Sequence, residues 1–221
     1  HGHRIIREVR LKSTRFVKSS EMTTYWETLN DYGSRAKYLL RPLLVFLAAM
    51  WLIEIFDRLL FGGSLDQLGI VPRQAVGLRG VLLAPLLHAG FGHLFANSIP
   101  FLVLGFMLML RHRPQIGLIS AIIVLISGLG TWLFAPPNTV TVGLSGLIFG
   151  YFAFLVVNAW YERSAGAIVF ALVVIITYGG LIWGIFPAGN GVSWQSHFFG
   201  MLGGIVAAHY LSTRGLIRST Q

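Results

Sequence analysis

A few polar side chains lie within or beside long apolar stretches of this sequence, where polar groups are costly. Each is a candidate functional residue, because ionisable and strongly polar side chains at membrane depth are expensive. Since the chain contains no cysteine, any nucleophile, base or hydrogen-bond donor has to be a serine, histidine, asparagine or carboxylate. The candidates are Glu54, Asp57, His88, His93, Asn97, Ser145, Asn158, His197 and His209.

His93 and Asn97 form the first pair with a suggestive spacing. Their i, i+4 separation places both on one face of a helix, so two hydrogen-bond donors point in one direction. His88 precedes them by five residues, and the glycines in between allow a turn that brings its ring back over the helix start. The plainer alternative is that His93 and Asn97 hydrogen-bond to neighbouring helices.

Ser145 and His197 form the second pair. Ser145 follows Gly143-Leu144 at the start of one apolar stretch, and His197 lies one turn into another. A serine there has a structural explanation as an N-cap. However, Ser145 is followed by Gly146 and Gly150, and His197 is followed by Gly200 and Gly204. Both pairs have a spacing that permits close helix packing. If the two glycine faces meet, Ser145 and His197 lie at similar depth, as a nucleophile and its base must.

The composition indicates which kind of element positions these residues. The chain has 221 residues, of which 55% are hydrophobic and 11% charged, and its mean hydropathy is +0.70. An ordinary soluble domain is roughly 45–50% apolar and about 25% charged. This composition argues against a water-soluble monomer and against disorder, which requires low hydrophobicity.

Six stretches approach the length of about 20 mostly apolar residues that a membrane-spanning helix needs. Breakers or charged residues separate them. The sequence therefore predicts an all-α membrane protein with a six-helix domain at 38–213, a basic segment at 1–37 and a short tail at 214–221. The first outer connection, 62–87, is expected to lie in the membrane interface. The six stretches cover roughly 42–61, 93–110, 116–135, 145–161, 167–186 and 194–211.

The charge distribution predicts the orientation. The net charge is +9, and nine of the 17 Lys and Arg residues lie within 1–41, which favours an anchor beside a membrane over a nucleic-acid-binding surface. Lys and Arg favour cytoplasmic loops. With both termini cytoplasmic, only Arg58, Arg73 and Arg79 fall outside. The N-terminal segment is suited to anionic lipids, with a flexible tail as an equal alternative.

The ordered set of motifs resembles the rhomboid family of intramembrane serine proteases. The set comprises His88-x4-His93-x3-Asn97, Gly143-Leu144-Ser145-Gly146 and His197-x2-Gly200-x3-Gly204, and the likeness covers about residues 40 to 212. It implies a dyad of Ser145 and His197 without a third carboxylate. It also implies an oxyanion hole made by His93, the Asn97 side chain and the backbone N–H of Ser145, in a water-filled cavity open to the outside.

Two positions depart from the family pattern. Many rhomboids carry a Trp-Arg pair in the loop after the first helix, where this chain has Leu78-Arg79, so this loop is expected to be seated differently. Many members also have a tyrosine packing on the catalytic histidine, where this chain has Phe149, which keeps the ring and loses the hydroxyl. Neither change removes a reacting group.

The remaining polar residues receive structural interpretations. Arg58 is a near partner for Glu54 or Asp57, so an ion pair or interfacial exposure is expected there. His112 is interpreted as a loop residue and His209 as an interfacial one. No spacing of histidines and carboxylates fits a metal site, and no cofactor is expected.

The function expected from the resemblance is that of an intramembrane serine endopeptidase acting on transmembrane proteins, in a bacterial plasma membrane with the active site opening to the outer face. The first alternative is a non-catalytic rhomboid-like scaffold that binds transmembrane clients. The second is a small transporter or channel lined by His and Asn. No nucleic-acid partner is expected.

Overall fold

The computed structural model describes residues 31–187 and 191–217. The chain divides into two units, His1–Pro42 and Leu43–Gln221. In the first unit, residues 31–42 are helical, and most of the basic segment expected at 1–37 lies outside the described residues. The second unit holds every motif singled out above.

The second unit is helical throughout its described part, apart from turns and one isolated antiparallel bridge between Ile70 and Thr141. Residues 43–56 are helical and continue into a π-helical turn, η1 (Asp57–Phe61). The first outer connection contains η2 (Ser64–Leu68), η3 (Ala75–Arg79), α2 (Gly80–Leu83) and η4 (Ala84–Leu86). The long helices follow: α3 (Phe91–His112), η5 (Arg113–Gln115), α4 (Ile116–Phe134), α5 (Ser145–Glu162), α6 (Ala165–Tyr178), η6 (Gly179–Ile185) and α7 (Trp194–Thr213).

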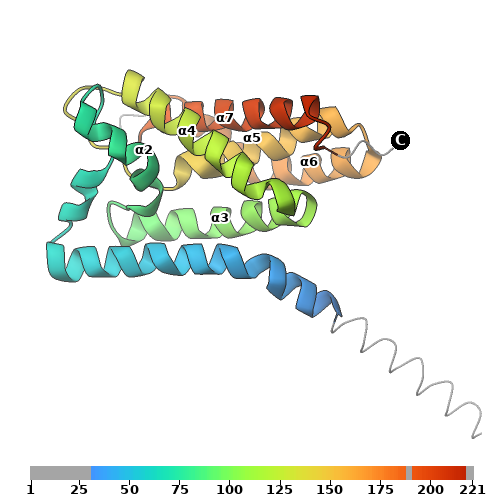
Figure 1. The fold of residues 1–221 in the computed structure, drawn as a ribbon, viewed down its shortest axis with the longest axis horizontal. Coiled ribbons are helices and arrows are strands. Elements are labelled where there is room, and N and C mark those ends of the chain that lie inside the picture. Colours follow the sequence, from blue (N-terminus) through green and yellow to red (C-terminus); the bar gives the residue numbers. More distant parts are fainter. Residues whose placement is uncertain (1–30, 188–190, 218–221) are drawn as a thin grey trace, which may run out of the picture. The chain divides into compact units, whose positions relative to one another are not determined.

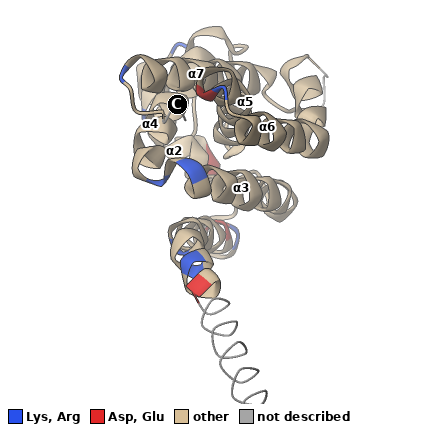
Figure 2. Cartoon of the chain, turned by 90° about the vertical axis from the view of Figure 1, so that its right-hand side faces the viewer, with Lys and Arg blue, Asp and Glu red and all other residues tan. Residues whose placement is uncertain are grey.

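Three helical runs among the described residues are long and apolar enough to cross a membrane: Asp31–Phe61, Phe91–Phe134 and Ala165–Ile185. The middle run comprises two helices, because η5 with Pro114 separates α3 from α4 and α4 turns back from the end of α3 (Figure 1). Figure 2 shows few charged positions among α3 to α7. The protein is therefore an all-helical integral membrane protein.

Helix α5 forms the centre of the second unit. It packs chiefly against α7 and also against α3, α4 and α6, while α7 packs against both α5 and α4. Phe154 on α5 is fully buried, and buried residues occur along the helix from Gly146 to Glu162. By contrast, α6 buries only Ala167, Ala171 and Val174. Helix α5, which carries Ser145, is thus packed against neighbouring helices on several sides, whereas most of α6 is not buried.

The first outer connection folds back onto α4 and onto the segment before α5. Ile70 exchanges two backbone hydrogen bonds with Thr141, of 2.9 and 3.0 Å. Arg73 donates through Nη1 to the carbonyls of Leu133 and Ala135 at the end of α4, at 2.9 Å each. These contacts satisfy helix-end carbonyls and anchor the segment that leads to Ser145.

The interpretation of His112 as a loop residue is wrong. His112 is the last residue of α3, it is buried, and its ring meets Phe154 edge-on at 5.1 Å. The helix continues to this residue because Pro114 opens the following turn, where its fixed φ and missing N–H are tolerated. His112 therefore belongs to the packing at the end of α3.

Candidate active site

Ser145 and His197 are joined by a hydrogen bond. The Ser145 Oγ lies 2.9 Å from the His197 Nε2, and the His197 Nδ1 lies 2.9 Å from the carbonyl oxygen of Gly184 in η6. A carbonyl only accepts, so Nδ1 carries the proton in this pair and a neutral ring presents the lone pair of Nε2 to the serine. The ring is thereby oriented as a general base for the hydroxyl.

The start of α5 shows that Ser145 is not a capping residue. The N-cap is Leu144, which makes no side-chain capping bond, and Ser145 is the first residue of the helix. Its hydroxyl is instead directed to His197. Helix α7 has a serine N-cap of its own, since the Ser193 Oγ accepts from the Ser196 N–H at 3.3 Å. The capping explanation for Ser145 is therefore wrong.

Two glycine pairs bring α5 and α7 into backbone contact. A Cβ at Gly200 would collide with the carbonyl oxygen of Gly146, and a Cβ at Gly204 would collide with that of Gly150. Only glycine permits this approach. The two faces meet directly below Ser145 and His197, which lets the two side chains reach each other.

Phe149 packs flat on the ring of His197. Its ring stacks on the His197 ring with centroids 3.9 Å apart and planes 10° apart. Glycine at position 184 leaves room for this stacking, because a Cβ there would lie 2.6 Å from the Phe149 Cζ and 3.2 Å from the His197 Nδ1. The Phe149 ring thus covers one face of the imidazole, and the Gly184 carbonyl binds its edge at Nδ1.

His93 faces the segment before Ser145. Gly143 has φ +119°, and a Cβ there would lie 2.6 Å from the His93 Cε1, so a side chain is excluded by both conformation and space. The His88 ring meets the His93 ring edge-on at 5.3 Å and is 1% exposed. Burial, together with the neighbouring His93, lowers the pKa of His88 from 6.5 to about 4, so this ring is neutral at neutral pH.

Asn97 lies one turn deeper on α3 than His93. It is buried, and its Nδ2 donates to the His93 carbonyl at 3.0 Å. His93 and Ser145 both line the main cavity of the site, and Asn97 is not among the residues that line it. One amide hydrogen of Asn97 is thus bound within α3, and its other hydrogen is left for another acceptor.

The cavity beside the dyad has a volume of about 520 Å³. Its walls are the extended segment Thr139 to Val142, the residues from Gly191 to Ser196, and His93 with Ser145 between them. This volume falls within the range of 300–1,000 Å³ typical of ligand sites. Ser145 therefore borders a space large enough for a short piece of polypeptide.

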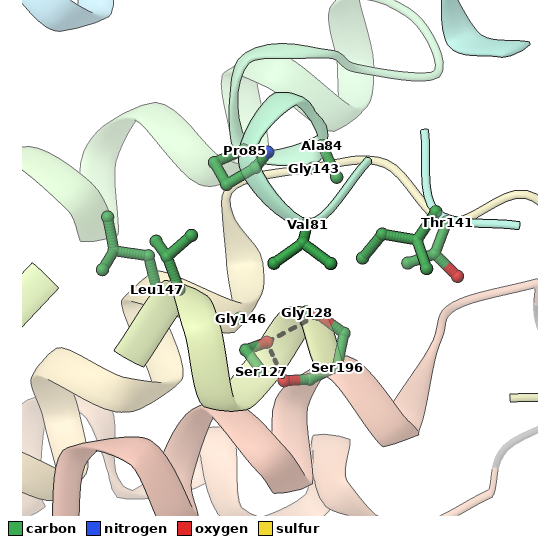
Figure 3. A pocket seen from close by; sticks show the side chains of 12 residues that line it. Val81, Ala84, Pro85, Ser127, Gly128, Thr141, Gly143, Gly146, Leu147 and Ser196 are labelled. Carbon is green, nitrogen blue, oxygen red and sulfur yellow. Dashed lines mark hydrogen bonds between the residues drawn. The ribbon is translucent and has the colours of Figure 1, made fainter. Parts of the chain in front are cut away.

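A second, smaller cavity of about 20 Å³ lies close to the dyad. Figure 3 shows Ser127 and Ser196 at one side of it, with Val81 and Thr141 opposite. The Ser127 Oγ donates to the Ser196 carbonyl at 2.9 Å and lies 3.3 Å from the Ser196 Oγ. The space suffices for about one water molecule.

Several other polar residues lie away from the dyad. Arg58 pairs with Glu54 as expected, at 2.8 Å, whereas Asp57 accepts from the Leu65 N–H at 2.9 Å. His209 contacts the Tyr161 hydroxyl at 3.2 Å. Within residues 31–187 and 191–217, no group of three potential metal ligands comes together.

A buried polar cluster joins the far ends of α3 and α5. Arg111 forms an ion pair with Glu162, and the Asn158 Nδ2 donates to the Glu162 Oε2 at 3.3 Å. The Arg111 guanidinium also lies over the Phe170 ring, 5.1 Å from its centroid. These contacts bind α3, α5 and α6 together, and Asn158 is a structural residue.

Sequence reasoning missed three contributors to the site. Gly184 acts through a backbone carbonyl, which no side-chain motif reveals, although the glycines at 179, 180 and 184 mark an unusual end to an apolar helix. Ser127 and Ser196 meet only because α4 and α7 pack together. No signal in the sequence alone pairs them.

Comparisons with known proteins identify the family. The family model described as Rhomboid domain matches residues 76–214. The Mycobacterium tuberculosis protein "Uncharacterized protein Rv1337" is 45% identical over 178 residues, covering 77% of this chain and 74% of that protein. The Mycobacterium leprae protein "Uncharacterized protein ML1171" is 39% identical over 180 residues, covering 77% of this chain and 70% of that protein. Since the matching model spans well over half of the chain, the protein belongs to the rhomboid family.

Proposed function

We propose that this protein is an intramembrane serine endopeptidase that hydrolyses peptide bonds in or near the transmembrane segments of other membrane proteins. The observation that carries the proposal is the 2.9 Å hydrogen bond between the Ser145 Oγ and the His197 Nε2, beside a cavity of about 520 Å³. Membership of the rhomboid family supports it, because the family includes such proteases.

The reaction begins at the dyad. His197 takes the proton from the Ser145 hydroxyl as Oγ attacks the scissile carbonyl carbon, and a tetrahedral intermediate forms. His197 then gives this proton to the leaving nitrogen as the C–N bond breaks, which leaves an acyl-enzyme. In the second half, water attacks the ester carbonyl carbon as His197 takes its proton. The C–O bond to Ser145 then breaks, His197 returns the proton to the Ser145 Oγ, and the product leaves with a free carboxyl group. The carbonyl of Gly184 keeps Nδ1 as the protonated nitrogen in the resting state.

The intermediate carries a negative charge on oxygen that requires donors already in place. In this proposal the donors are His93, the Asn97 side chain and the backbone N–H of Ser145. His93 borders the same cavity as Ser145, which supports its role. Asn97 lies deeper on the same helix and contributes the amide hydrogen that is not bound to His93. An uncharged amide avoids the cost of burying another charge.

The proposal includes a membrane arrangement. Helices α5 and α7 cross the membrane together with the three apolar runs, giving six spans in one domain at 38–213. Both termini are cytoplasmic and the cavity opens to the outer face of a bacterial plasma membrane. Support comes from the Lys and Arg distribution. Helices α5 and α7 have 18 and 20 residues, about the number a span needs. The basic segment at 1–37 binds anionic lipids.

A serine-directed fluorophosphonate and a helical membrane substrate test the proposal. The purified wild type should be labelled at Ser145 and should cleave the substrate, and Ser145→Ala and His197→Ala should each abolish both activities. Ser120→Ala is the matched control, since this serine hydrogen-bonds to Tyr151 at 2.6 Å away from the cavity. Cleavage by Ser145→Ala would overturn the proposal. An unlabelled, inactive wild type would favour the client-binding scaffold.

A further inference from the structure

Arg58, at the outer end of the first helix of the second unit, joins three parts of the chain. Its Nε donates to the Glu54 Oε1 at 2.8 Å, and its Nη2 lies 3.4 Å from the Asp66 Oδ2 in the first outer connection. The same Nη2 lies 3.5 Å from the carbonyl oxygen of His88. One guanidinium therefore contacts its own helix, the following loop and the turn that precedes α3.

Charge and burial hold this guanidinium in place. Glu54 is 2% exposed and Asp57 is 1% exposed. Asp57 fixes the loop independently by accepting from the Leu65 N–H. A buried carboxylate requires a partner, and Arg58 is the cation that Glu54 contacts in the described part of the chain. The planar fork of arginine can serve several acceptors at once in a fixed geometry, whereas lysine is a flexible point charge.

The His88 carbonyl is next to the start of α3. Gly90 is the N-cap of this helix and His93 is its third residue. A Cβ at Gly90 would lie 3.9 Å from the Arg58 Nη2, so the guanidinium lies against this turn. A displacement of the turn is therefore transmitted to the histidine that borders the nucleophile's cavity.

Apolar contacts hold the same two helices together further along. Trp51 stacks on Phe91 with ring centroids 6.1 Å apart and donates through Nε1 to the Ser98 Oγ at 3.2 Å. The ring stacking places the helices side by side with little directional preference, and the Trp51–Ser98 hydrogen bond adds direction away from the turn at 88–90. The hydrogen bonds of Arg58 add direction at the outer end, where the orientation of the helix start matters for chemistry.

We propose that Arg58 is a positioning residue for catalysis, which clamps the turn at 88–90 to the first helix and thereby fixes His93 relative to Ser145. The inference rests on the proposed function. Arg58 lies outside the matched family region, residues 76–214, so the clamp is a feature beyond the part of the chain that the family model covers. Arg58 acts through α3 and takes no part in proton transfer.

The first test compares Arg58→Lys with Arg79→Lys in the full chain. Lysine at 58 keeps a charge for Glu54 but cannot reach Asp66 and the His88 carbonyl together. The kcat should fall about tenfold with KM nearly unchanged, because small displacements of reacting groups are costly. Arg79 provides the control, since its Nη2 donates to the Gln67 carbonyl at 3.0 Å within the same loop. Equal kcat values for the two variants would overturn the proposal.

A double-mutant cycle with His93→Ala separates positioning from general destabilisation. If Arg58 acts through His93, Arg58→Lys should lower kcat much less in the His93→Ala background than in the wild type. The same tenfold loss in both backgrounds would overturn the proposal. Should Arg58→Lys fold poorly, the Glu54→Gln/Arg58→Gln pair removes the clamp together with the buried charge of Glu54, and it should show the same loss.

These outcomes are distinguishable from failure of the proposed function. Loss of cleavage in Ser145→Ala, together with a fully active Arg58→Lys, would overturn the clamp alone. Cleavage by Ser145→Ala would overturn the assigned nucleophile, and the positioning role argued here with it.

Discussion

Replacing Gly184 with alanine would add one methyl group at the most crowded point around the base. Its Cβ would lie 2.6 Å from the Phe149 Cζ, 3.1 Å from the Cε1 of the same ring and 3.2 Å from the His197 Nδ1. Carbon atoms prefer separations of about 3.5–4.0 Å, so the ring pair or the η6 backbone has to move by about 1 Å. Either movement disturbs the bond between Nδ1 and the Gly184 carbonyl.

The expected effect on the rate follows from this displacement. A misplacement of about 1 Å can cost about 10²-fold in rate, and losing a neutral hydrogen bond of about 1 kcal/mol adds a few-fold. We therefore expect kcat to fall by about 10²-fold or more, with KM nearly unchanged. The cavity that receives substrate is not lined by Gly184, so substrate binding should persist.

The assay is steady-state cleavage of a helical membrane substrate in detergent, with fluorophosphonate labelling of Ser145 and thermal unfolding measured on the same samples. Gly180→Ala is the matched control, because a Cβ there meets nothing within 4 Å in the same 3-10 segment. If Gly184→Ala cleaves and labels as fast as Gly180→Ala, the backbone carbonyl does not orient the base and the reasoning fails.

Three further outcomes are expected. Asn97→Ala should lower kcat by about 10²–10³-fold if its amide binds the oxyanion, and full kcat with a lowered melting temperature would assign it a structural role alone. Gly204→Leu should lower both activity and stability, because a side chain there collides with the Gly150 carbonyl; cross-linking of cysteines introduced near Ser145 and His197 measures the separation, and an unchanged yield would contradict this. Burial raises the pKa of Asp66 from 3.8 to about 6, so the folded state binds the Asp66 proton more tightly than the unfolded state. Proton binding therefore stabilises the folded state at low pH, and this contribution is lost as pH rises from about 4 to 6. The melting temperature of the wild type relative to Asp66→Asn should therefore fall across that window, and a flat difference would contradict the shift.

Much of the helical architecture was predictable from the sequence because apolar stretches separated by breakers determine it. The expected start of the stretch at 145 coincides with the start of α5, and the stretch at 194–211 matches α7 to within two residues. Rhomboid membership was likewise predictable and is confirmed by the match over residues 76–214. The number of membrane spans and their orientation stay predictions.

The parts that could not be predicted depend on backbone geometry and on packing between distant segments. The carbonyl of Gly184 is chemically the same as every other carbonyl in the chain, and only the path of η6 brings it to His197. His112 was assigned to a loop because charged neighbours and Pro114 suggested a break, yet the helix ends at His112, two residues beyond the expected stretch. The contact between Arg58 and the His88 carbonyl joins residues 30 positions apart, and no periodic pattern in the sequence indicates such a contact.

The backbone contact between α5 and α7 has a consequence for how the protein responds to its bilayer. Gly146 and Gly150 meet Gly200 and Gly204 without intervening side chains, so these two helices cannot tilt separately. Helix α6, which buries three residues, has no such constraint. In a thicker or thinner bilayer, mismatch is relieved by tilting the elements that move most freely. Changes in lipid thickness should therefore reorient α6 while the distance between Ser145 and His197 stays constant.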